Sequence, residues 1–145
     1  MNINDIRQRS RHYSKTEMMD YIAQVTGKRL TATEFDSLMR KALPKESYYQ
    51  ERIIQAIKEA YPAPATFVWK AAAGVYSRQG IPDVCAIIDG QFYGFEVKRP
   101  YIGKLSKIQE QTLNAIRMAG GKVAVVSWPE QVWEVIRNDT GPDGQ

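Results

Sequence analysis

The sequence contains almost no cysteine or histidine. Of its 145 residues, one is a cysteine, Cys85, and one is a histidine, His12. A single cysteine excludes an internal disulfide and suits a reducing compartment, so we expect a cytoplasmic protein in which Cys85 is a small buried core residue. A single histidine argues against a histidine-rich zinc site and against a His-based nucleophilic triad within one chain.

Long hydrophobic runs are also missing. No stretch approaches the roughly 20 apolar residues that span a bilayer, and the N-terminus is charged, unlike a signal peptide. We therefore expect no membrane association. The length suits one domain with room for a small appendage, and 43% hydrophobic with 25% charged residues is ordinary for a soluble globular protein. The net charge of +4 is compatible with a polyanionic partner but does not demand one.

The most informative stretch runs from residue 80 to residue 99. It reads as two short strands joined at Asp89-Gly90, because Asp-Gly between two β-rich apolar runs is a strong hairpin signal. If the loop has two residues, Ile88 pairs with Gln91 and each later pair keeps the same sum of residue numbers. The spacing therefore predicts the register of the whole hairpin.

That register places Asp83 directly across from Glu96, and Lys98 projects from the same face because side chains alternate along a strand. Like charges at opposite positions repel, so two carboxylates and an ammonium at one end of a mostly apolar face need compensation. A divalent cation held by oxygen ligands would supply it. The alternative is a surface strand with an ordinary Glu–Lys pair, which the cross-strand aspartate disfavours.

These residues resemble a known motif. Pro82-Asp83, followed thirteen residues later by Glu96-Val97-Lys98, is similar to the PD-(D/E)XK nuclease motif. The sequence of residues 80–83 (GIPD) and the later segment 105–109 (LSKIQ) resemble the VRR-NUC branch of that superfamily. The resemblance covers about residues 45–137. The resemblance implies an α/β fold in which a restriction-endonuclease-like mixed sheet is flanked by helices. It also implies a metal-dependent endonuclease that hydrolyses phosphodiester bonds in DNA.

The resemblance further implies roles for the motif residues. Asp83 and Glu96, with the backbone carbonyl of Val97, would hold one or two Mg²⁺ ions, with Mn²⁺ as a substitute and no small-molecule cofactor. Lys98 would orient the attacking water or stabilise developing negative charge, and the sequence leaves those two roles open.

A further acidic ligand is expected from a helix predicted over about residues 45–60. Its apolar stripe continues backwards to Glu46, whereas Glu51 lies roughly 130° away around the helix at about 3.6 residues per turn. The family has an acidic residue in this helix, so the role is assigned to Glu46 with Glu51 as the fallback. The alternative for Glu46 is a first-turn acid favoured by the helix dipole.

Gln109 admits two interpretations. Ser106 and Gln109 have capping-box spacing for a helix, and Gln109 also continues the apolar stripe that would face the sheet near Lys98. The family has a glutamine near the catalytic centre at this position, so a catalytic-site role is expected.

The remaining elements follow from periodicity and turn signals. Strands are predicted at 66–73 and 122–128, with a last helix at 129–136, giving the order β-β-β-α-β-α. Capping boxes open two short helices at Ser14 and Thr31. Residues 1–13 are interpreted as a flexible basic arm or a solvated terminus. The predicted organisation is a helical appendage over 1–43, a nuclease domain over 44–138 and a disordered tail over 139–145.

The appendage is interpreted as a packing or dimerisation element, with a DNA-binding helix-turn-helix as the alternative. Basic residues beside the motif are candidates for contacts with nucleic acid: Lys70, Arg78, Arg99, Lys104 and Lys107, with Tyr76 and Gln79 as weaker candidates. Stand-alone VRR-NUC proteins are similar to Holliday-junction resolvases, which implies branched DNA, a homodimer and a bacterial or phage setting. Alternatives are a flap or nicking DNA nuclease, an RNA-directed nuclease, a catalytically silent DNA-binding module and an interaction protein.

Overall fold

The computed structural model describes residues 1–72 and 78–139. Within that part the chain forms two compact units. One contains residues 1–45 with the returning segment 99–103, and the other contains residues 46–98 and continues from residue 104. No helix in the described ranges combines the length and the apolar character that crossing a bilayer requires. The two units are described in turn.

The N-terminal unit consists of three helices, α1 (Ile3–Ser10), α2 (Lys15–Thr26) and α3 (Ala32–Ala42). The two predicted capping boxes open α2 and α3. The segment 99–103 closes the unit, because the Tyr101 hydroxyl donates to the backbone carbonyl of Tyr13 and its ring lies edge-on to Phe35. Its core is made by apolar side chains from all of these segments: Ile6, Met18, Ile22, Phe35, Met39, Ala42, Leu43 and Ile102.

The interpretation of residues 1–13 as an arm or a solvated terminus is wrong for Ile3–Ser10, because these residues form the helix α1. Asn2 accepts from the Asp5 N–H at 2.9 Å, and the Asp5 side chain accepts from the Asn2 N–H, so the segment begins with a capping box of its own. Ile6 is 2% exposed and Ser10 is buried. One apolar anchor in eight residues leaves too little periodicity for the sequence pattern to predict the helix.

The second unit is built on a mixed four-stranded sheet in the order β1-β2-β3-β4. The strands are β1 (Thr66–Lys70), β2 (Val84–Ile88), β3 (Gln91–Val97) and β4 (Lys122–Val126), and β3 and β4 run parallel while the other neighbours are antiparallel. The predicted hairpin register is confirmed, with Ile88 opposite Gln91. Asp89 and Gly90 have φ of 49° and 81°, the left-handed values that a two-residue turn of this type requires.

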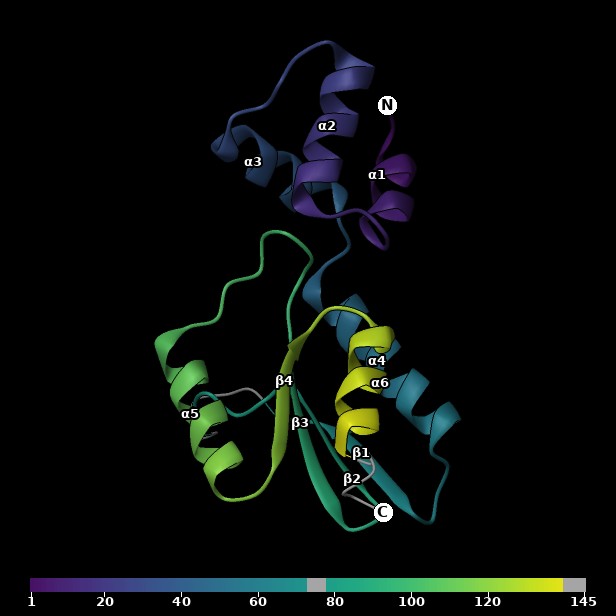
Figure 1. Ribbon diagram of the computed structural model, residues 1–145, viewed down its shortest axis with the longest axis vertical. Coiled ribbons are helices and arrows are strands. Elements are labelled where there is room, and N and C mark those ends of the chain that lie inside the picture. The colour runs from purple at the N-terminus through teal and green to yellow at the C-terminus, as the bar shows by residue number, and fades with distance from the viewer. Residues whose placement is uncertain (73–77, 140–145) are drawn as a thin grey trace. The chain divides into compact units, whose positions relative to one another are not determined.

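Helices cover both faces of this sheet (Figure 1). The helices α4 (Glu46–Ala60) and α6 (Pro129–Asp139) lie on one side and α5 (Lys107–Met118) lies on the other. The main core lies between the sheet and the α4–α6 layer, around Ile53, Ile57, Phe95 and Val132. The predicted α/β fold, a mixed sheet flanked by helices after a helical N-terminal part, is confirmed. The first strand ends at Lys70, three residues earlier than predicted.

Candidate metal centre

Asp83 and Glu96 meet where the hairpin opens. Asp83 immediately precedes β2, and Glu96 is the second-last residue of β3. The Asp83 Oδ2 atom accepts a hydrogen bond from the Val97 N–H at 2.9 Å, which fixes this carboxylate against the neighbouring strand. The Glu96 side chain is 0% exposed. The carboxylate pair that the register predicted is therefore present, with Glu96 buried and Asp83 partly exposed.

Glu46 completes the acidic cluster. It is the first residue of α4, and one oxygen from each of Glu46, Asp83 and Glu96 lies within 4.8 Å of the other two. Glu51, the fallback, is exposed and lies 3.8 Å from the Nζ of Lys70. Within the described residues, the structure thus groups Glu46 with the motif acids and leaves Glu51 in an exposed ion pair.

Lys98 lies beside the cluster, as predicted. Its Nζ is 3.9 Å from the Glu96 Oε1, and its side chain is 14% exposed. Its backbone is anchored on both sides, because its N–H donates to the Val126 carbonyl at 2.9 Å and its carbonyl accepts from the Ser127 hydroxyl at 2.6 Å. The ammonium therefore projects from a fixed point of the sheet.

Gln109 satisfies both of its interpretations at once. Its Oε1 accepts from the Ser106 N–H at 2.9 Å, forming the capping box of α5. Its Nε2 donates to the Glu96 Oε1, also at 2.9 Å. Because the cap occupies the carbonyl oxygen, the amide group can present only its N–H to the carboxylate.

Two glycines allow the loop before β2 to reach this position. A Cβ at Gly80, where φ is 84°, would lie 2.8 Å from the Ile108 carbonyl oxygen and 2.5 Å from the Thr112 Oγ1. A Cβ at Gly94 would lie 2.9 Å from the ring of Pro82. Nothing local in the sequence indicates either close approach. The shared role of the two glycines is to let the loop pack on β3 and α5 and so place Asp83.

The cluster contains three carboxyl groups and has one ammonium group beside it, so negative charge is in excess. Burial in the first place, together with the Asp83 and Glu46 carboxyls, raises the pKa of Glu96 to about 8. The nearby Lys98 ammonium opposes the shift without cancelling it. A hydrogen bond between the Asp83 and Glu96 carboxyls requires a proton on one of them; when both are ionised, the buried Glu96 Oε2 has no partner among the described residues.

The donor set fits a hard divalent cation. Mg²⁺ is bound in proteins through carboxylate oxygens together with water and substrate phosphate oxygens, and an unpartnered buried carboxylate oxygen costs free energy unless a cation or a proton satisfies it. Glu46, Asp83 and Glu96 are the residues that would hold the ion. The Val97 carbonyl as a further ligand stays a prediction.

Cys85 is buried on the same face, between the site and the end of the hairpin. Desolvation raises the pKa of its thiol to about 11, and the charges of Asp83 and Glu96 act in the same direction. A thiol that keeps its proton is neither a nucleophile nor a ready metal ligand. The expectation that Cys85 is a small core residue is confirmed.

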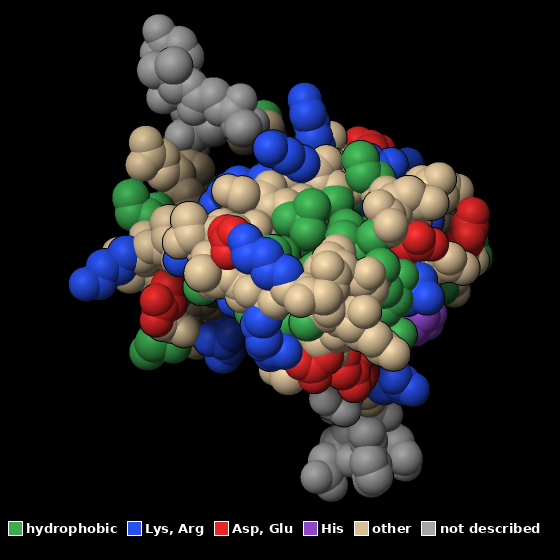
Figure 2. All heavy atoms as spheres, turned by 90° about the horizontal axis from the view of Figure 1, so that it is seen from above, with side chains coloured by type: hydrophobic (Ala, Val, Ile, Leu, Met, Phe, Trp, Pro, Cys, Tyr) green, Lys and Arg blue, Asp and Glu red, His purple; other side chains and the backbone are tan. Residues whose placement is uncertain are grey.

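The predicted nucleic-acid contacts differ in their surroundings. Lys70, Arg78, Lys104 and Lys107 are exposed, whereas the Arg99 guanidinium donates to the carbonyls of Arg40, Leu43 and Pro44 at 2.9–3.0 Å. Arg99 thus caps the C-terminal end of α3, a role that the sequence did not suggest. On the face drawn in Figure 2, Lys and Arg side chains are spread among Asp and Glu and do not form one basic patch. Tyr76 lies outside the described residues.

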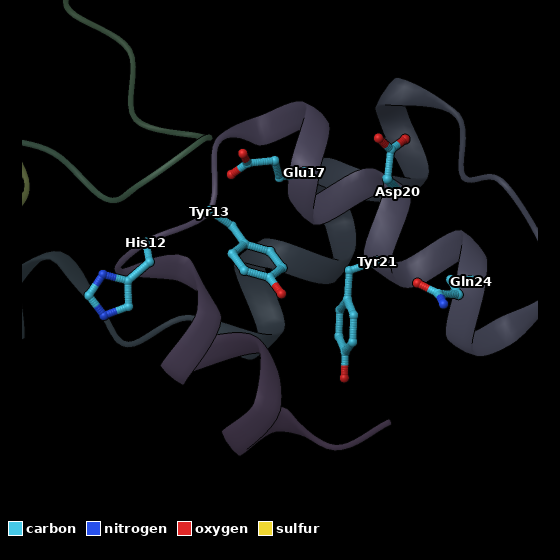
Figure 3. Close-up of a pocket in the computed structure, with 6 residues that line it drawn as sticks. All are labelled: His12, Tyr13, Glu17, Asp20, Tyr21 and Gln24. Atoms are coloured by element: carbon cyan, nitrogen blue, oxygen red, sulfur yellow. The ribbon is translucent and has the colours of Figure 1, made fainter.

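The N-terminal unit has a hollow of about 500 Å³ that the sequence analysis did not anticipate, lined by His12, Tyr13, Glu17, Asp20, Tyr21 and Gln24 (Figure 3). Its acids already have partners: Glu17 accepts from the Ser14 N–H and Asp20 pairs with Arg29. The Tyr21 ring is covered by the Arg9 guanidinium at 4.1 Å. The hollow therefore lacks a converging group of carboxylates like that of the acidic cluster.

A solved structure described as a VRR_NUC domain is similar to this chain, with 28% sequence identity and a TM-score of 0.49. The match covers 63% of this chain and 94% of that one. This chain resembles a VRR-NUC domain. No protein-family model and no curated protein matches the chain.

Proposed function

We propose that this chain is a metal-dependent phosphodiesterase that cleaves DNA. The observation that carries the proposal is the set of three carboxylate oxygens within 4.8 Å of one another, one of them from a fully buried glutamate, with an ammonium 3.9 Å from that glutamate. A structural role alone does not account for such a cluster, because burying Glu96 beside two further acids, with one lysine nearby, costs free energy. A divalent cation and a phosphodiester would balance the charges.

In the proposed mechanism, Glu46, Asp83 and Glu96 would hold a Mg²⁺ or Mn²⁺ ion through their oxygens. The ion would supply Lewis acidity and would lower the pKa of a water bound to it. Gln109 keeps the Glu96 carboxylate in a fixed orientation through its Nε2 donor. Lys98 places its positive charge beside the attacked phosphate, where it orients the water or stabilises the charge that develops in the transition state.

The finer form of the proposal is a structure-specific nuclease that acts on branched DNA as a homodimer. Paired symmetric cuts across a junction need two sites related by a two-fold axis. The support is the resemblance of residues 80–83, 96–98 and 105–109 to a family that includes junction resolvases. A flap or nicking nuclease uses the same site with one cut per binding event, so the substrate must be decided by experiment.

The test is cleavage of end-labelled four-way junction, flap, duplex and single-stranded DNA, each with Mg²⁺, Mn²⁺ or EDTA. Asp83→Ala and Lys98→Ala are compared with Glu51→Gln as a matched control, since Glu51 lies on α4 outside the cluster. Metal-dependent cleavage that is lost in the first two variants and kept in the control supports the nuclease. Paired cuts in the junction alone support the resolvase. Absence of cleavage with any substrate and metal overturns the proposal.

A further inference from the structure

The face of the sheet that carries the acidic cluster continues into an aromatic strip. Side chains alternate along each strand, so Asp83, Cys85 and Ile87 point to one face. Their cross-strand neighbours on β1 are Trp69, opposite Cys85, and Phe67, opposite Ile87. The strip, defined here as Phe67, Trp69, Ile87 and Phe92, therefore begins about two residues from the carboxylates and runs away from them.

The strip is accessible. Phe67 is 67% exposed and Ile87 is 41% exposed, while Trp69 and Phe92 are half-buried. The helix α5 packs on this face over β4, at the opposite edge of the sheet from β1. Figure 1 places α5 alone on this side of the sheet among the three helices of the unit. Phe67 on the edge strand β1 and Ile87 opposite it on β2 thus place two exposed apolar side chains side by side, and such a patch can mark a binding surface.

The rings are arranged as a continuous series. The centroids of Phe67 and Trp69 are 5.5 Å apart, and those of Trp69 and Phe92 are 6.5 Å apart. Both spacings exceed the rise of about 3.4 Å between stacked bases in one strand of B-DNA. Bases within a duplex already have both faces covered by their neighbours, so rings on a protein surface stack only on bases that are unpaired and spread apart.

A hollow of about 390 Å³ adjoins the outer end of the strip. It is lined in part by Phe67, Tyr61 and Lys58. Thr66 and Val68, which alternate with Phe67 along β1 and so point to the opposite face of the sheet, also line it. The hollow therefore lies around the edge at β1 and not on the face of the strip.

We propose that this strip is a stacking platform for unpaired nucleotides, and that the substrate is DNA with a single-stranded segment beside the scissile phosphate. This inference rests on the proposed nuclease function. A base next to the cut stacks on Trp69, and the following base stacks on Phe67. The strip and the acidic cluster lie on the same face of the sheet. This favours the substrate, and not a second copy of the chain, as the molecule that covers the strip.

The test separates binding from cleavage. Fluorescence anisotropy in EDTA measures the affinity for a labelled oligo-dT and for a duplex carrying an oligo-dT arm, with fully paired duplex as the reference. Phe67→Ala and Trp69→Ala are each expected to weaken binding of the arm by roughly 5- to 150-fold, as base–aromatic stacking implies, without changing duplex binding. Phe67→Tyr is expected to retain wild-type affinity, because it keeps the ring.

Two further variants give the test its controls. Phe67→Leu keeps apolar area but removes the π-face, so it is expected to bind the arm as weakly as Phe67→Ala. Met118→Ala removes a side chain that is 90% exposed on α5, and it is expected to leave binding unchanged. Circular dichroism melting of each variant checks that the fold is intact.

The proposal is overturned if the arm binds no better than duplex, or if Phe67→Leu binds it like wild type. It is also overturned if Phe67→Ala converts a dimer into a monomer in light scattering while arm binding is unchanged, because the strip would then cover a second copy. Loss of arm binding in Phe67→Ala, with no cleavage by wild type under any metal, would support the platform and remove the proposed catalysis. The two failures are therefore distinguishable.

Discussion

Gln109 donates a hydrogen bond from its Nε2 to the Oε1 of Glu96 at 2.9 Å. The orientation of its amide is not free, because its Oε1 is held by the Ser106 N–H that opens α5. Helix capping and ligand orientation are therefore performed by one side chain. A carboxylate held in this way presents a defined oxygen to a metal, and partners of ligating side chains tune metal affinity.

We predict that Gln109→Met weakens metal binding and cleavage about 10- to 100-fold, because an outer-shell hydrogen bond to a ligand is lost. Ser106→Ala removes the hydroxyl that caps α5 and keeps the Gln109 amide, so it should lower stability by about 1 kcal/mol with little effect on metal affinity. Mn²⁺ titration by calorimetry and cleavage rates at saturating metal check both variants. Equal effects of the two substitutions would mean that Gln109 acts only as a cap.

The raised pKa of Glu96 predicts the pH dependence of stability of the metal-free protein. In the unfolded chain this carboxyl has a pKa of 4.5, and in the folded chain about 8, so the folded state binds more protons between these values. The contribution of Glu96 to stability is then fully present below pH 4.5 and is lost as the pH rises towards 8. The loss is on the order of 3 kcal/mol, because one pKa unit corresponds to about 1.4 kcal/mol.

Urea unfolding in EDTA at pH 5 and pH 8 measures this slope. Glu96→Gln keeps the size of the side chain without the charge, so it should flatten the slope and stabilise the metal-free protein at pH 8. Glu59→Gln, on the exposed side of α4, is the matched control and should leave the slope unchanged. A wild-type protein that is equally stable at both pH values would contradict the assignment of a protonated Glu96.

Metal addition should reverse that loss. A ligand that binds only the folded state stabilises it by about 2.7 kcal/mol at a concentration 100-fold above its Kd. We therefore expect Mg²⁺ or Mn²⁺ to raise the Tm at pH 8, and to raise it less in Glu46→Gln. Glu51→Gln, five residues along the same helix, should respond like wild type. The same response in both variants would remove Glu46 from the set of ligands.

The sequence alone predicted the elements whose signals are local. The Asp89-Gly90 turn determines the hairpin register, and that register places Asp83 opposite Glu96. Helical spacing placed Glu46 on the apolar stripe and Glu51 away from it, and the family resemblance then assigned the ligand role to Glu46. These inferences succeeded because a pleated strand and an α-helix each have a fixed period.

The features that the sequence did not predict depend on contacts between distant segments. The helix α1 rests on its cap and on Ile6, whose burial comes from packing against α2 and α3. The need for glycine at position 94 comes from Pro82, which approaches across the sheet. Arg99 was expected to contact nucleic acid because it is basic and lies near the motif, and nothing local indicates that carbonyls some 55 to 60 residues earlier in the chain accept its hydrogen bonds.

Gly80→Ala tests how far the loop before β2 controls the site. The substitution places a Cβ 2.8 Å from the Ile108 carbonyl oxygen at a φ of 84°, so it should destabilise the fold by more than about 1 kcal/mol. Displacement of the loop should also move Asp83 and weaken Mn²⁺ binding. Gly27→Ala also has a positive φ but has nothing within 4 Å of its Cβ, so it should lose stability and keep metal affinity. Unchanged metal affinity in Gly80→Ala would show that Asp83 is held by β2 and β3 alone.

Arg99 and Lys104 are two cations close to the motif, and they differ in their surroundings. The Arg99 guanidinium donates to three carbonyls at the end of α3, whereas Lys104 is exposed. Arg99→Ala should therefore destabilise the N-terminal unit by about 1–3 kcal/mol, the usual range for bonds from a charged donor. Arg99→Lys should not rescue it, since an ammonium lacks the planar fork. Lys104→Ala should change stability by less than about 0.5 kcal/mol.

Salt dependence of DNA binding distinguishes the two residues further. Each phosphate contact that is lost reduces the slope of log K against log salt by about 0.9 on duplex DNA. If Lys104 contacts phosphate, Lys104→Ala reduces the slope by about this amount. Arg99→Ala should leave the slope unchanged at a temperature where the variant is folded, because its donors already have carbonyl partners. A reduced slope in folded Arg99→Ala would show that the guanidinium exchanges its carbonyl partners for phosphate when DNA binds.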